Sequence, residues 1–98
     1  MVAPIITEPS CQTVYENENA VFETRILEGI PNPTVLWFRD SKLLGNTKKI
    51  SLQSNGNNRK LTIRSCDSKK TGQITVTATN KAGEQSYTAS LIVKGNPI

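Results

Sequence analysis

Hydrophobic and polar residues alternate along most of this chain with a period of two. Successive side chains of a β-strand point to opposite faces of its sheet, so this spacing is typical of strands that bury one face. The 3.6-residue period of an amphipathic helix does not appear. The sequence therefore predicts an all-β protein whose inward positions are Ala20, Phe22, Thr24, Ile26, Val35, Trp37, Leu61, Ile63, Ile74, Val76, Ala78, Ala89, Leu91 and Val93.

Turn-forming residues separate the predicted strands. Gly29-Ile-Pro-Asn-Pro33 cannot continue a central strand because proline lacks an amide hydrogen. Ser54-Asn-Gly-Asn-Asn58 and Asn80-Lys-Ala-Gly83 favour hairpins, since Asn and Gly tolerate positive φ. Asp40-Ser-Lys42 is expected to turn the chain into a short edge strand. The predicted strands span residues 4–7, 10–15, 19–28, 34–40, 47–54, 58–66, 72–80 and 83–94, a spacing that indicates a two-sheet sandwich.

The length of 98 residues fits one domain, with a core from about residue 3 to 94 and the start of a linker at 95–98. With one Trp and two Phe in the whole chain, Trp37 and Phe22 are expected to supply much of the core volume. No apolar stretch approaches the ~20 residues that a membrane span needs. Nothing at the N-terminus has the pattern of a signal peptide.

The two cysteines, Cys11 and Cys66, are predicted to be free thiols. Cys66 follows the alternating Leu61-Thr-Ile63 and is expected at an apolar site at the end of its strand, whereas Cys11 lies early in the chain. Free thiols persist in reducing compartments, and disulfides are typical of secreted domains of this size. The sequence therefore favours a cytoplasmic location.

Five motifs follow one another along the chain: Gly29-x-Pro31-x-Pro33-x-Val35-x-Trp37, Leu61-x-Ile63, Gly72, Ala78-x-Asn80-x-x-Gly83 and Ala89-x-Leu91-x-Val93. In this order and spacing they resemble the immunoglobulin I-set family over nearly the whole chain, from Ala3 to Val93. The resemblance implies an immunoglobulin-like Greek-key sandwich of two sheets, with Trp37 in the core.

The chain departs from the family pattern where a disulfide usually joins the two sheets across the tryptophan. These positions hold Thr24 and Val76, so we expect Val76 to pack on Trp37 and the buried Thr24 hydroxyl to need a partner. Ile74 replaces the usual corner tyrosine. Lys70 replaces an acidic residue two positions before Gly72, with Asp67 nearby as a partial substitute. We expect a folded domain of modest stability.

Cysteine-poor I-set domains of this kind are similar to those of giant muscle proteins such as titin, twitchin and obscurin. The similarity implies a structural and protein-interaction module of a cytoplasmic, sarcomeric multidomain protein: a spacer, a load-bearing element and a docking surface. Its partners would be neighbouring immunoglobulin or fibronectin modules and components of the actin or myosin filaments, with no nucleic acid or membrane. Two alternatives stay open: an extracellular adhesion or receptor module that lacks its disulfide, and an actin-binding module with a basic face.

Side chains for catalysis are scarce. The chain has no histidine, the commonest general base and metal ligand. Its acidic residues are scattered without a calcium-loop pattern, and its cysteines lack the CxxC spacing of a zinc or redox site. We therefore expect no enzyme activity, cofactor or metal.

Three features are candidates for binding. The first is a basic set near two central strands, which would suit an acidic partner if it shared one sheet face: Lys48, Lys49, Arg59, Lys60, Arg64, Lys69 and Lys70. The net charge of +4 is compatible with this role, although a solvated face that blocks aggregation would show the same pattern. The second is an apolar patch formed by Phe38 with Leu36 and Ile92. The third is an edge strand, in the N-terminal segment or after Asp40, that could accept an added strand.

Overall fold

The computed structural model describes residues 1–66 and 71–95. Within these residues the chain forms nine β-strands, and no helix long and apolar enough to cross a membrane occurs among them. The predicted all-β class is confirmed. The strands are β1 (Val2–Ile6), β2 (Gln12–Tyr15), β3 (Ala20–Ile30), β4 (Thr34–Arg39), β5 (Lys42–Leu43), β6 (Ile50–Asn55), β7 (Asn58–Ile63), β8 (Gly72–Asn80) and β9 (Gly83–Lys94).

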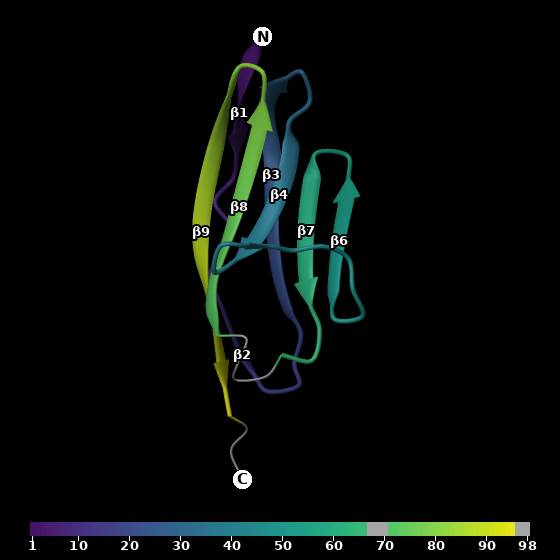
Figure 1. The fold of residues 1–98 in the computed structure, drawn as a ribbon, viewed down its shortest axis with the longest axis vertical. Coiled ribbons are helices and arrows are strands. Elements are labelled where there is room, and N and C mark those ends of the chain that lie inside the picture. The colour runs from purple at the N-terminus through teal and green to yellow at the C-terminus, as the bar shows by residue number, and fades with distance from the viewer. Residues whose placement is uncertain (67–70, 96–98) are drawn as a thin grey trace.

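The strands make two sheets in a Greek-key arrangement. One sheet has the order β1-β3-β7-β6 and the other has the order β2-β9-β8-β4-β5. The chain passes from one sheet to the other after β1, β2, β3, β5 and β7, and among the described strands only the pairing of β2 with β9 is parallel. The N-terminal end of β1 and the C-terminal end of β9 lie at opposite ends of the molecule (Figure 1).

Some strand boundaries differ from the prediction. β3 continues to Ile30, past the predicted end at residue 28, because Ile30 pairs with Val2 of β1. β7 ends at Ile63, before the predicted residue 66, since Ser65 has a φ of 49° that a strand cannot adopt. β6 begins at Ile50 rather than at residue 47. Of the predicted linker at 95–98, residues 96–98 lie outside the described residues.

The core lies between the two sheets and has the predicted composition. Phe22 of β3 and Trp37 of β4 are its largest buried side chains, and Trp37 stands opposite Val76 of β8 in the strand register. Cys66, which was expected at an apolar site, is fully buried. The predicted inward faces of β3, β7, β8 and β9 are all buried, which confirms the period-two assignment.

Two glycines are required by the local geometry. Gly56 has a φ of 60° in the two-residue turn that joins β6 to β7, as the Asn-Gly signal predicted. At Gly72 a Cβ atom would lie 2.5 Å from Oδ2 of Asp40. The Asp40 carboxylate occupies this space because its Oδ1 accepts a hydrogen bond from the amide of Gln73 at 3.0 Å.

Candidate protein-interaction surfaces

Thr24 and Val76, which stand where a disulfide would usually join the sheets, are accommodated in different ways. Val76 is fully buried, and Thr24 is 2% exposed. The Thr24 hydroxyl donates to the carbonyl oxygen of Thr7 at 2.5 Å, and Oγ1 of Thr7 accepts from the amide of Arg25 at 2.9 Å. The buried hydroxyl thus has the partner that the sequence required, and the link joins β3 to the segment after β1.

Both cysteine thiols are free. Cys11 is exposed, and its Sγ accepts a hydrogen bond from the amide of Ser90 at 3.4 Å. Cys66 is buried, and its thiol donates to the carbonyl oxygen of Ile63 at 3.5 Å. One thiol is therefore accessible to reagents in the folded domain, and the other is shielded.

The ends of the chain are held by contacts between residues far apart in sequence. β2 runs parallel to β9, from Gln12 opposite Leu91 to Tyr15 opposite Lys94, and the amide of Glu16 donates to the carbonyl oxygen of Lys94 at 2.9 Å. At the opposite end of the molecule, Nδ2 of Asn80 donates to the carbonyl oxygen of Val2 at 2.7 Å. A force that pulls the two ends of the chain apart would load these hydrogen bonds.

The predicted basic set divides among several places. Lys48 and Lys49 are exposed in the loop before β6, Lys60 is on β7, and Arg64 follows β7. Lys69 and Lys70 lie outside the described residues. Lys60 and Arg64 lie on the outer face of the β6–β7 hairpin, because they alternate with buried Leu61 and Ile63. The exposed Lys49 is next to Arg64, whose amide donates to the Lys49 carbonyl oxygen at 2.6 Å.

Arg59 does not join this face. It has the same strand parity as the buried Leu61, and its guanidinium donates to the carbonyl oxygens of Gly56 at 2.7 Å and Asn58 at 3.0 Å. Its charge therefore lies at the hairpin turn. Of the residues expected to share one sheet face, Lys60 and Arg64 have the same strand parity and Arg59 has the opposite one.

The predicted apolar patch is not continuous. Leu36 and Ile92 are 40% and 43% exposed, but Phe38 is only partly exposed. Phe38 stands opposite Thr75 of β8, whose hydroxyl lies 3.2 Å from that of Thr88 on β9. These polar side chains separate Phe38 from Ile92, which lies further along β9.

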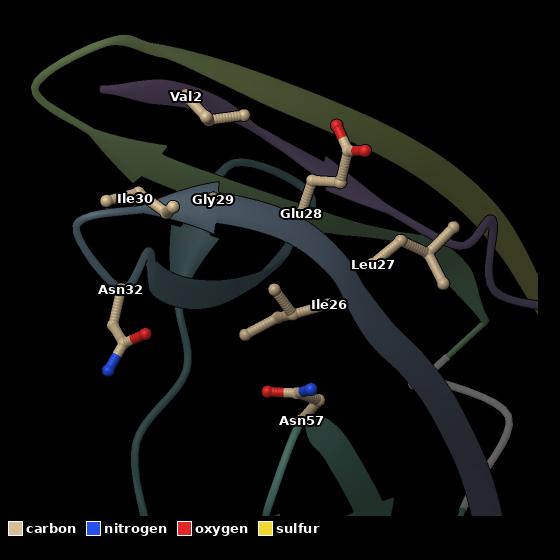
Figure 2. Close-up of a pocket in the computed structure, with 8 residues that line it drawn as sticks. All are labelled: Val2, Ile26, Leu27, Glu28, Gly29, Ile30, Asn32 and Asn57. Atoms are coloured by element: carbon tan, nitrogen blue, oxygen red, sulfur yellow. The ribbon is translucent and has the colours of Figure 1, made fainter.

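A different apolar surface occurs at the N-terminal end of the molecule. Val2 and Ile30 stand opposite each other at the ends of β1 and β3, and Leu27 and Ile30 are 56% and 62% exposed. They border a hollow of about 380 Å³ that also reaches Asn57, as Figure 2 shows. This surface was not predicted from the sequence, because Ile30 lies in the turn-forming segment from Gly29 to Pro33. The signal that could have indicated it is the set of apolar side chains at positions 2, 27 and 30.

The sheet edges differ in how open they are. β5, the predicted edge after Asp40, has only two residues and offers little backbone for strand addition. β2 ends the order of its sheet, so the N-terminal segment stays a candidate acceptor. The edge of β6 is covered by its own loop: Oδ1 of Asn46 accepts from the amide of Leu52 at 2.8 Å, and Oγ1 of Thr47 accepts from that of Ile50 at 3.1 Å.

The sequence of this chain matches a model of the immunoglobulin I-set domain over residues 3–93. The chain belongs to the immunoglobulin I-set family. Its fold and its motifs are those that the sequence predicted, and the recognised family is confirmed.

Relatives of this I-set domain are muscle proteins. It is 34% identical over 94 residues to the muscle M-line assembly protein unc-89 of Caenorhabditis elegans, an alignment that covers 95% of this chain and 1% of unc-89. It is 34% identical over 95 residues to mouse myotilin, covering 95% of this chain and 19% of myotilin. The chain thus spans only a small part of these proteins.

Solved structures of titin domains have the same fold. The titin M3 domain superimposes with a TM-score of 0.85 and 33% identity, covering 93% of this chain and 96% of M3. The titin domains Z1Z2, solved in complex with telethonin, give a TM-score of 0.87 and 32% identity over 95% of this chain and 48% of theirs.

Residues 1–66 and 71–95 of the I-set domain contain no group of three or more His, Cys, Asp or Glu that could hold a metal ion. Every buried side-chain nitrogen or oxygen in the same ranges has a hydrogen-bond partner.

Proposed function

We propose that this I-set domain is a structural and protein-interaction module of a multidomain protein of the muscle cytoskeleton. Its role is to space and connect neighbouring modules, to bear tension along the chain and to dock other proteins. The observation that carries the proposal is the placement of the two chain ends at opposite ends of the molecule, with β2 and β9 paired in parallel between them (Figure 1).

This geometry suits resistance to tension. Pulling the ends apart slides β2 along β9, so the hydrogen bonds between these strands are loaded together in shear rather than opened one at a time. The same fold hosts many functions, so fold alone does not establish a mechanical role. The specific support is the register from Gln12 to Tyr15, extended by the bond from Glu16 to Lys94.

The proposed location is the cytoplasm of muscle, at the sarcomere. Both thiols are free, and a core without a disulfide suits a reducing compartment. The similarity to unc-89 and myotilin supports the muscle setting. We propose neighbouring immunoglobulin or fibronectin modules and filament proteins as its partners.

Single-molecule force spectroscopy of the domain between reference modules tests the mechanical role. Glu16→Pro removes the amide that donates to Lys94, whereas Glu16→Ala changes the same side chain but keeps that amide. We expect the wild type and Glu16→Ala to unfold at similar, substantial forces and Glu16→Pro at a clearly lower force. A wild-type domain that unfolds at negligible force would end the proposal, whatever the variants do.

A further inference from the structure

The outer face of the β6–β7 hairpin carries a regular grid of polar side chains. Ser51 stands opposite Thr62, and both alternate with residues that pack on the core. Two residues from this pair, just outside the ends of β6 and β7, Lys49 lies opposite Arg64, since the amide of Arg64 donates to the carbonyl oxygen of Lys49 at 2.6 Å. Two hydroxyls and two cations therefore form adjacent rows, separated by two residues or about 6.6 Å along each strand.

The two hydroxyls are open to a ligand. On the other sheet, facing hydroxyls bond each other, with Thr77 and Ser86 at 3.0 Å as one example. Ser51 and Thr62 form no such bond with any residue that the structure describes, and both side chains are partly exposed. Each keeps one donor hydrogen for a partner outside the domain.

The positively charged residues Lys49 and Arg64 stand opposite each other across this backbone hydrogen bond. Like charges directly opposite on a sheet destabilise it, and within the described ranges neither Lys49 nor Arg64 forms an ion pair. Further along the hairpin, Lys60 stands opposite Glu23 of β3, so that carboxylate offsets its charge. The positive end of this face is therefore the row of Lys49 and Arg64.

We propose that Lys49, Ser51, Thr62 and Arg64 form a binding site for carboxylates of an acidic, extended segment of a partner protein. The Arg64 guanidinium can donate two parallel hydrogen bonds to one carboxylate, and the positive charge of Lys49 attracts the same group. The hydroxyls of Ser51 and Thr62 donate to a second carboxylate in the next row. Side chains two residues apart on an extended segment have the spacing of these rows.

Recognition at this site uses the face of the sheet rather than its edge. The amides of Ile50 and Leu52, which an added strand would need, already donate to Thr47 and Asn46. The partner is therefore selected by its acidic side chains and not by backbone pairing. This inference rests on the docking role proposed above and names the class of partner for one surface.

An NMR titration of the whole domain with hexaglutamate peptide tests the site. We expect the largest amide shifts at Ser51, Thr62 and their strand neighbours. Lys49→Glu/Arg64→Glu should weaken binding by about tenfold or more. The matched control, Lys42→Glu/Lys81→Glu, makes the same change in net charge at exposed positions beside the other sheet and should weaken binding by about threefold at most.

Three results would overturn the site: no binding at low salt, equal loss in both double variants, or shifts spread over all the lysines. If the charge reversals unfold the domain, the neutral pairs Lys49→Gln/Arg64→Gln and Lys42→Gln/Lys81→Gln give the same comparison. Ser51→Ala/Thr62→Ala should weaken binding by about two- to fivefold. A negative titration would overturn the binding site but would not change the result of the force measurement. The binding site and the mechanical role are therefore tested independently.

Discussion

The hydroxyl of Thr24, buried between the sheets, donates a hydrogen bond of 2.5 Å to the carbonyl oxygen of Thr7. Thr24 occupies one of the two positions at which the family commonly carries its disulfide. The bond shows how a polar side chain is accommodated there: the segment that follows β1 supplies the acceptor. This chain, which lacks the cross-link between the sheets, thus gains a hydrogen bond between β3 and the segment that follows β1.

Replacing Thr24 by valine should destabilise the domain by about 1 kcal/mol, because the volume is kept but the buried hydrogen bond is lost. Equilibrium unfolding in urea measures the change. Thr79→Val, at an exposed position, is the control and should stay within about 0.5 kcal/mol of the wild type. A Thr24→Val variant as stable as the wild type would show that the bond contributes nothing.

Asn80 is expected to hold the N-terminal strand to the rest of the domain. Its Nδ2 donates to the carbonyl oxygens of Val2 and Pro31, and its Oδ1 accepts from the amide of Ala82 at 2.8 Å. Asn80→Ala should cost roughly 1–3 kcal/mol and speed hydrogen exchange in β1.

Asn80→Asp separates the two roles of this side chain. It keeps the acceptor for the turn amide of Ala82 but loses the donor to Val2 and Pro31. We expect faster exchange in β1 with the β8–β9 turn still protected. An unchanged rate of hydrogen exchange in β1 would show that the Asn80 side chain does not hold this strand.

The loop before β6 is expected to prevent association through that edge. Asn46→Ala/Thr47→Ala removes the side chains that accept from the amides of Leu52 and Ile50, so an exposed edge becomes available to a second chain. Size-exclusion chromatography with light scattering should show concentration-dependent dimers or larger species. Ser54→Ala/Asn55→Ala, on the same strand, is the control, and equal behaviour of the two double variants would contradict the protective role.

Much of the fold was predictable because it depends on local pattern. The alternation around Phe22 and Ile26 identified the buried face of β3, and Asn55-Gly56 identified the β6–β7 turn. The end of β3 was not predictable in this way. Ile30 follows a glycine and precedes a proline, and it joins the strand only because Val2, far away in sequence, pairs with it.

The candidate surfaces were less predictable because they depend on side-chain direction and loop conformation. Arg59 was grouped with its neighbour Lys60, but the strand alternation and the hairpin carbonyls turn its guanidinium away. Lys49 and Arg64 become neighbours only through the register of β6 and β7. The acceptor of the Thr24 hydroxyl lies 17 residues earlier in the chain, and no sequence pattern pointed to it.

The central claim is that this domain closes its core without a cross-link and works in a reducing compartment. The most direct test is mass spectrometry of the native protein, extracted from its cells under conditions that alkylate free thiols at once. We expect Cys11 to be alkylated in the folded protein and Cys66 to be alkylated only after unfolding. Recovery of the two cysteines as a disulfide-linked peptide would contradict it.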